Sequence, residues 1–315
     1  MKDAIMSKRN LQSLAIISIA IVILIVQKFL FPFPERWQWI FFIITMFVTG
    51  LPHGAFDYLV AKQQASSSHK SFSITKFYIH YLFKMIAYAV GWYFFPVASL
   101  VLFLLISAYH FGESDLLHYS AAKRSLKELH KVFHGASILL ILIISDATIS
   151  IPIINGIIKD YDSSALLHQL EPYTYILPAI NCVIAWILYR NTILHTIYYI
   201  ITYLIIIIII SSLPLPLGFA LYFSCWHSIN TLTDIHQFLT NNHAQKKQLW
   251  HILKSGSPFI LLTWAGIVLA LYGIQQSSQP QNILSLLFIS ISILTLPHVG
   301  VMSIMLNKYS KQSQN

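Results

Sequence analysis

Four histidines stand deep inside apolar stretches of the chain, and their side chains could bind a metal. They are His53, His110, His227 and His298. An ionisable side chain inside a membrane is costly and usually faces the protein interior. A neutral imidazole is also a common ligand for iron, copper, zinc and nickel. One such histidine would more often be a hydrogen-bonded packing residue, but four that meet at one point favour a metal centre and leave the metal open.

A carboxylate follows two of these histidines by about one helical turn. Asp57 comes four residues after His53, and Glu113 comes three residues after His110. Residues at these spacings share a helix face. A metal-bound histidine usually donates its second N–H to a carboxylate or a carbonyl, so we expect Asp57 and Glu113 to orient the two imidazoles. Asp234, two turns beyond the third histidine, is a weaker candidate for the same role.

Aromatic residues flank the four histidines. Aromatic side chains at membrane interfaces usually form a belt, but those beside deep histidines could line a slot for a long apolar ligand, because ligand pockets are mostly apolar. Plain helix packing is the alternative interpretation. The candidates for a substrate slot are Tyr58, Tyr109, Phe111, Phe223 and Trp226.

The elements that must position these residues are apolar blocks of membrane-spanning length. Hydrophobic residues make up 56% of the 315 residues and charged residues only 10%, against about 25% charged in soluble domains. A helix needs about 20 apolar residues to cross the bilayer core. The third and fourth blocks join tightly near Pro96, so eight or nine spans would also fit the pattern. The ten blocks cover roughly 11–31, 37–62, 76–95, 97–118, 131–154, 172–189, 192–212, 216–238, 257–274 and 282–306.

The placement of the basic residues supports this division. With ten spans and both termini in the cytoplasm, 16 of the 20 Lys and Arg residues fall in cytoplasmic segments, as the positive-inside rule requires. We therefore attribute the net charge of +9 to basic residues that mark the cytoplasmic segments, and not to a nucleic-acid-binding surface. We expect one all-α domain over residues 1–315, a multi-pass bundle in the plasma or inner membrane, in contact with lipid and without a nucleic-acid partner.

This topology places the four histidines at similar depth. They fall in the second, fourth, eighth and tenth blocks, which all run from outside to inside. Their distances from the outer ends differ by at most five residues, or about 8 Å at 1.5 Å per residue. Two further polar residues are expected elsewhere: Asp115 near the cytoplasmic end of its span, where solvent could reach it, and His134 about one turn into the next span. His130 is expected at the interface.

Four motifs, taken together, resemble one known family. They are Pro-His-Gly-Ala-x-Asp at 52–57, Tyr-His-Phe-Gly-Glu-Ser-Asp at 109–115, Trp-His-Ser at 226–228 and Pro-His-Val-Gly at 297–300. The chain resembles the Brp/Blh family of bacteriorhodopsin-related membrane proteins, the β-carotene 15,15'-dioxygenases, over about residues 37–306. The block at 11–31 would then be an extra, peripheral span.

The resemblance implies an activity and a cofactor. The activity is cleavage of β-carotene with O₂ at its central double bond to give two retinal molecules, and the cofactor is Fe(II) held by histidines. The family's ligands match His53, His110 and His227. Some members are expected to carry another histidine one turn after the Trp-His pair, but Thr231 stands there, and His298 is the natural fourth ligand by depth. A retinal-binding rhodopsin is an expected functional partner.

Two other functions remain open on the residues alone. Intramembrane His, Asp and Glu also serve in proton relays, and prolines that interrupt spans suit a transport site, so a proton- or metal-coupled transporter is the first alternative. A di-iron desaturase or hydroxylase is the second, although the chain has no His-x-x-His pair. No side chain has an evident partner that would activate it as a protein nucleophile.

Overall fold

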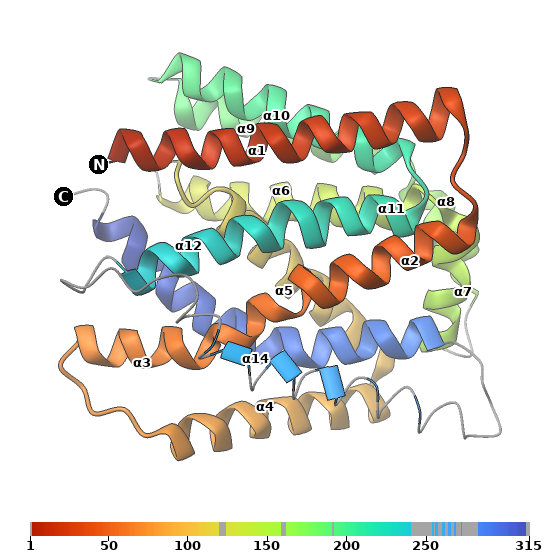
Figure 1. The fold of residues 1–315 in the computed structure, drawn as a ribbon. Helices are drawn as coiled ribbons and strands as arrows, with labels where there is room; N and C mark the ends of the chain where they lie inside the picture. Colours follow the sequence, from red (N-terminus) through yellow and green to blue (C-terminus); the bar gives the residue numbers. More distant parts are fainter. Residues whose placement is uncertain are drawn as a thin grey trace.

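The computed structural model describes residues 2–119, 124–158, 162–190, 192–240 and 283–312, with isolated positions between 254 and 272. Within these ranges the chain is helical and has no β-strand. The helices, shown in Figure 1, are α1 (Lys2–Ile25), α2 (Glu35–Thr45), α3 (Asp57–Ser67), α4 (Ile74–Phe94), α5 (Pro96–Asp115), α6 (Arg124–Ile144), α7 (Ala147–Ile158), α8 (Ser164–Leu170), α9 (Tyr173–Tyr189), α10 (Ile193–Ser212), α11 (Leu215–Phe219), α12 (Ile229–Thr240) and α14 (Ile283–Gln312).

Four shorter helical segments adjoin these helices. Three are π-helical: η1 (Val26–Leu30), η2 (Met46–Gly50) and η4 (Ala220–Ser228). The fourth, η3 (Pro52–Phe56), is a 3₁₀-helix. They continue or join the helices of three of the predicted blocks, so each of those blocks is one helical run with a local change of winding.

The prediction of an all-helical membrane bundle is confirmed. Six helices in the described ranges are long and apolar enough to cross a membrane, or seven if a bent pair counts as one span. The total of ten spans stays a prediction. Helix α4 and the run from α11 to α12 match predicted blocks without belonging to the six, and the block at 257–274 lies outside the described residues apart from isolated positions.

One predicted span is wrong in shape. The block at 131–154 is not a single helix, because α6 and α7 meet at a bend of 102°. Asp146 lies at the bend, and its backbone carbonyl accepts the first amide hydrogens of α7, from Ile149 at 3.2 Å and Ser150 at 3.0 Å. Its carboxylate accepts a hydrogen bond from Thr148 at 2.6 Å and one from the backbone of Leu215 at 3.3 Å. A charged residue that starts a new helix redirects the chain within an otherwise apolar block.

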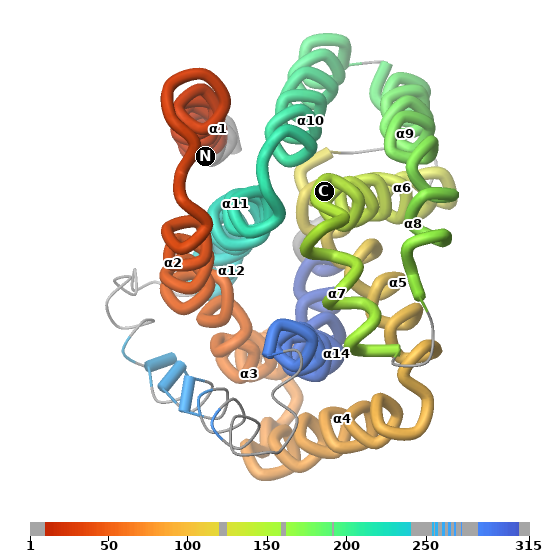
Figure 2. The backbone as a smooth tube through the Cα atoms, turned by 90° about the vertical axis from the view of Figure 1, so that its right-hand side faces the viewer, coloured from red at the N-terminus to blue at the C-terminus, as the bar shows by residue number. Residues whose placement is uncertain are grey.

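The bundle surrounds α14. Seen along the helices, α14 lies between α3, α4, α5 and α7, while α6, α9 and α10 form a further group on one side (Figure 2). Helix α1 lies at the edge and contacts α10, α12 and η4. That the first block is an extra, peripheral span stays a prediction.

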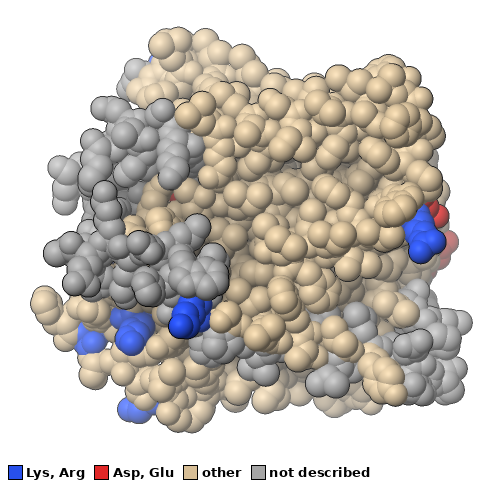
Figure 3. Space-filling model, viewed as in Figure 1, with Lys and Arg blue, Asp and Glu red and all other residues tan. Residues whose placement is uncertain are grey.

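The outer surface has the character of a lipid-facing surface. Large apolar side chains point outward along several helices, among them Phe83 and Tyr93 of α4, Tyr175 of α9 and Leu194 of α10. In Figure 3 the middle of the visible face carries almost no charge, and Lys and Arg gather mainly at the end where both termini lie. An apolar patch of this size on a folded protein marks contact with another apolar phase.

Candidate metal centre

The structure brings the four deep histidines together in the interior. Their imidazoles form a closed ring of neighbours: the centroids of His53 and His298 are 4.8 Å apart, those of His298 and His110 5.1 Å, those of His110 and His227 5.1 Å, and those of His227 and His53 5.7 Å. All four residues are at most 5% exposed. The depth comparison made from the sequence therefore placed them correctly relative to one another.

Three of the four histidines bring their ring nitrogens near one another. One nitrogen each of His53, His110 and His298 lies within 4.8 Å of the others. Two nitrogens on one metal at about 2 Å each can be up to about 4 Å apart, so a small inward movement would complete the site. His227 stands beside this group and packs at 4.7 Å against the ring of Phe111.

The bonding state of the nitrogens fits a metal site. Both ring nitrogens of His110 and Nε2 of His298 are buried and have no hydrogen-bond partner among the described residues. A buried polar atom without a partner is costly and calls for an explanation. A bound cation would satisfy one nitrogen of His110 and Nε2 of His298, which helix packing alone leaves without a partner.

Asp57 orients a histidine, but not the one that its spacing indicated. Its Oδ1 accepts a hydrogen bond at 2.8 Å from Nδ1 of His298, on α14, rather than from His53. Its Oδ2 accepts another at 2.9 Å from the hydroxyl of Tyr81. Because Nδ1 of His298 carries the proton, Nε2 keeps its lone pair and faces the histidine cluster. This is the arrangement of a carboxylate behind a metal-bound histidine.

Glu113 does not bond to His110, which corrects the second expectation. Its carboxylate accepts hydrogen bonds from Ser303 of α14 and, at 3.3 Å, from Tyr109, and its Oε1 lies 3.6 Å from the ammonium of Lys131. The side chain turns away from the histidines toward a buried cation. It ties α5 to α14 and so fixes His110 relative to His298 through the backbone.

Asp234 has a partner outside the histidine cluster, and its predicted role behind His227 stays a prediction. It accepts a hydrogen bond at 3.1 Å from Nε2 of His118, near the end of α5. Thr231, at the position where a further histidine was considered, lies 3.0 Å from the hydroxyl of Ser114. Both contacts join α12 to the α5 region, and neither reaches the histidine cluster.

Asp115 is buried rather than solvated. Its side chain is 5% exposed, and its Oδ2 accepts three hydrogen bonds, from His134 at 3.0 Å, Tyr222 at 3.1 Å and Trp226 at 3.3 Å. Tyr222 and Trp226 belong to η4, the π-helix that carries His227. Asp115 therefore fastens η4 to α5, the helix that carries His110.

A second histidine cluster lies behind Asp115, and sequence reasoning did not identify it. His130 and His134 are 0% and 3% exposed, although His130 was expected at the interface. Both bond to the hydroxyl of Tyr199, at 3.2 Å and 2.8 Å. We call His130 and His134 the tyrosine-linked pair. The four-residue spacing on α6 was the available signal, since it places both side chains on one helix face.

The proton positions in this pair follow from Asp115. As a carboxylate, Asp115 only accepts, so Nε2 of His134 donates and its Nδ1 accepts the single hydrogen of Tyr199. Tyr199 must then accept from Nε2 of His130, whose Nδ1 in turn accepts from Tyr189 at 3.2 Å. Every ring nitrogen of the tyrosine-linked pair has a protein partner.

Two close helix contacts hold these groups in place. A Cβ on Gly112 would collide with the backbone of Lys131, and one on Gly135 would collide with the backbone of Ala108, so α5 and α6 touch backbone to backbone. Small residues permit such approaches in membrane bundles.

The winding of the histidine-bearing segments is irregular. His53 lies in η3, just after Pro52, and His227 lies in η4. Thr49 of η2 donates a hydrogen bond at 2.9 Å to the carbonyl of Ser224 in η4. Proline has no backbone donor, and π-helical turns are common at functional sites. These breaks turn the two imidazoles toward the cluster.

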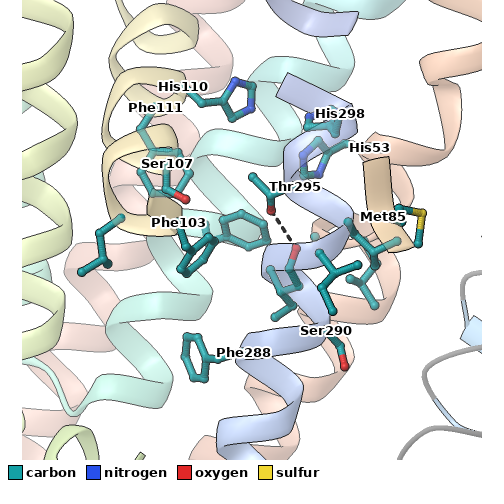
Figure 4. A pocket seen from close by; sticks show the side chains of 18 of the residues that line it. His53, Met85, Phe103, Ser107, His110, Phe111, Phe288, Ser290, Thr295 and His298 are labelled. Carbon is teal, nitrogen blue, oxygen red and sulfur yellow. Dashed lines mark hydrogen bonds between the residues drawn. The ribbon is translucent and has the colours of Figure 1, made fainter. Parts of the chain in front are cut away.

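A cavity of about 660 Å³ opens beside the histidines. Its wall is predominantly apolar and includes His53, His110 and His298 (Figure 4). On α14 the lining extends from Phe288 to His298, about 15 Å along the helix. The histidines stand toward one end of that stretch. On their other side the lining continues through Tyr58, Phe77 and Tyr78, so the cavity extends in two directions from the cluster.

The five predicted slot residues divide into two groups. Tyr58, Phe111 and Phe223 line the cavity. Tyr109 and Trp226 do not: Tyr109 donates to Glu128 at 2.8 Å, and the indole of Trp226 donates to Asp115. The sequence also missed much of the lining, which includes Phe103, Phe219, Phe288, Tyr81 and Trp92.

Comparison with known proteins gives one family and one relative. The family model described as beta-carotene 15,15'-dioxygenase matches residues 44–306. A curated beta-carotene 15,15'-dioxygenase from an uncultured marine bacterium, 66A03, is 35% identical over 98 residues, which cover 31% of this chain and 34% of that protein. The match thus spans about a third of the relative's length. No solved structure matches.

Proposed function

Because the chain belongs to the beta-carotene 15,15'-dioxygenase family, we propose that it cleaves β-carotene at its central double bond. The reaction consumes one O₂: the C15=C15' and O=O bonds break, two C=O bonds form, and two molecules of retinal leave. The observation that carries the proposal is the contact between three converging histidines and an apolar cavity that extends from them in two directions. A polyene cut in the middle needs room on both sides of the reacting bond.

The residues present fit an iron ion. His53, His110 and His298 offer nitrogen ligands, and His227 stands close enough to join them or to cover an open position. Imidazole suits ferrous iron among other metals. Fe(II) bound there would supply the activation of O₂. Asp57 is bonded to His298, and its charge would offset part of the ion's charge.

The rest of the chain positions the substrate. Phe111 and Phe223 pack against the histidines at the cavity wall, where they would hold the polyene beside the ion and keep water out. A carotenoid dissolves in the bilayer, so a cavity among lipid-facing helices is placed where the substrate is. We also propose a plasma- or inner-membrane location with cytoplasmic termini, supported by the basic residues at that end. A retinal-binding rhodopsin would be a consumer of the product.

The test is expression in a bacterium that accumulates β-carotene, with pigment and retinal quantified by chromatography. The wild type should bleach the cells and yield retinal, with one iron per chain in the purified protein. His110→Ala should leave the colour unchanged and lower the iron content. Persistent colour in cells that hold iron-loaded wild-type protein in the membrane would refute carotenoid cleavage and favour a metal- or proton-coupled transporter.

A further inference from the structure

The serine and threonine hydroxyls that line the cavity differ in whether they make a hydrogen bond within the protein. Ser290 donates to the carbonyl of Leu286 at 2.7 Å, and Thr295 donates to the carbonyl of Ile291 at 2.8 Å (Figure 4). Both bonds return to the preceding turn of α14, which is the usual arrangement for Ser and Thr in a membrane helix. These two hydroxyls are therefore satisfied within their own helix.

Two other serines of the cavity lining differ from these: Ser150 of α7, whose buried hydroxyl has no partner among the described residues, and Ser107 of α5. Only Ser107 of these two lies on a helix that carries one of the clustered histidines. It lines the same cavity and is only 3% exposed. Its hydroxyl makes no hydrogen bond to any residue that the structure describes, although the carbonyl of Phe103 lies one turn back on its own helix. A buried hydroxyl without a partner is unfavourable. At the cavity wall the Ser107 hydroxyl is available to bond a ligand.

Ser107 stands beside the histidine cluster rather than at a far end of the cavity. It precedes His110 by three residues, on the same side of α5. Side chains on a helix lean toward its N-terminus, so the imidazole of His110 leans over the turn that holds Ser107. The neighbouring lining residues Phe103 and Phe111 are apolar. Among the α5 residues that line the cavity, Ser107 therefore carries the one hydroxyl, one turn from His110.

The geometry points to an oxygen-binding role for this hydroxyl: we propose that Ser107 donates a hydrogen bond to the carbonyl oxygen of the aldehyde formed at the cleaved carbon. This inference rests on the proposed function. β-Carotene is a hydrocarbon and offers the hydroxyl no acceptor. An acceptor appears beside the histidines only when the C=O bond forms, so the interaction stabilises the late stage of the reaction and the product, not the substrate.

The experiment compares two ligands that differ by one oxygen. All-trans-retinal and a retinoid hydrocarbon without the carbonyl are titrated into the purified full-length protein, kept under nitrogen so that no turnover occurs. Ser107→Ala should weaken retinal binding by roughly fivefold, the worth of one net hydrogen bond, and leave the hydrocarbon affinity unchanged. Ser107→Thr keeps a hydroxyl and should restore retinal binding.

Ser290→Ala is the matched control, because it removes a satisfied hydroxyl from the same cavity; it should change neither affinity. An infrared readout adds a signature that packing cannot produce. The C=O stretch of bound retinal should lie at lower wavenumber in the wild type than in Ser107→Ala.

Two results would overturn the inference: equal retinal affinity in wild type and Ser107→Ala, or an equal loss for both ligands. In either case carotenoid cleavage by the wild type would leave the proposed function standing. If the wild type binds neither ligand and leaves β-carotene intact, the proposed function itself fails and this inference fails with it.

Discussion

The protein buries two groups of histidines, and they differ in how their nitrogens are used. In the tyrosine-linked pair every ring nitrogen has a hydrogen-bond partner, in a chain that ends on Asp115. In the candidate metal centre both nitrogens of His110 and one of His298 have none among the described residues. Burial is nearly the same in both groups. What separates a binding site from a packing network is therefore the unmet bonding capacity, not depth in the membrane.

The largest expected difference between the groups comes from removing one histidine from each. His110→Ala should abolish iron binding and reduce retinal formation by at least a hundredfold, because it deletes a ligand. His134→Ala should keep one iron per chain and lose about 1–3 kcal/mol of stability, since it leaves Tyr199 and Asp115 without a partner. Iron content by mass spectrometry and thermal unfolding measure both. A folded His134→Ala protein without iron would contradict the assignment of different roles to the two histidine groups.

The next effect concerns the carboxylate behind the metal centre. Asp57→Asn should reduce iron affinity or activity by about 10- to 100-fold, the usual cost of losing a partner behind a metal-bound histidine. The amide cannot balance charge, although it can still accept from Nδ1 of His298. Chelator competition gives the iron affinity. Asp162→Asn, in the exposed stretch before α8, is the control and should match the wild type.

A smaller effect is expected at Asp115, which bonds both the tyrosine-linked pair and the segment that carries His227. Asp115→Asn weakens the hold on Tyr222 and Trp226, so η4 and His227 should become less well placed. We expect activity to fall by several-fold with iron still bound, and the electron paramagnetic resonance spectrum of the nitric oxide adduct of the iron to broaden. Asp115→Ala should show both changes more strongly. An unaltered spectrum in both variants would mean that Asp115 belongs to the packing network alone.

The smallest effect should come from Tyr189, at the end of the hydrogen-bond chain opposite Asp115. Tyr189→Phe removes the hydroxyl that donates to His130 and leaves the other links in place. We expect a loss of about 0.5–1.5 kcal/mol in stability and unchanged retinal formation, read from denaturant unfolding and chromatography. A large loss of activity here would show that the tyrosine-linked pair takes part in the reaction.

The parts of the site that the sequence predicted are those set by helix depth. His53 and His298 are 245 residues apart, yet their positions in their blocks placed them at one level, because helix rise per residue is constant. The partners of the carboxylates were not predictable this way. The spacing of Asp57 and His53 assumed a regular α-helix, but the chain passes there through η3, a 3₁₀-helix that begins at Pro52. The change in winding turns Asp57 to α14 instead.

The sequence also did not predict the buried polar pairs that join neighbouring helices. Asp115, His130 and Lys131 all stand near a helix end in sequence, where solvent is the simplest expectation. Their burial depends on the backbone contact of α5 with α6, which Gly112 and Gly135 permit. Which helices touch is a property of the whole bundle, so a single apolar block carries little information about it.

The bend between α6 and α7 bears on which bond the proposed reaction would cleave. Helix α7 lies across the end of the bundle opposite the two termini (Figure 1), and Ile153, Ile154 and Ile157 line the cavity there. In the proposed reaction, a rod-shaped polyene that passes the histidines would stop against these isoleucines. The distance from them to the histidines would then set how many double bonds lie between the end of the substrate and the bond that is cleaved.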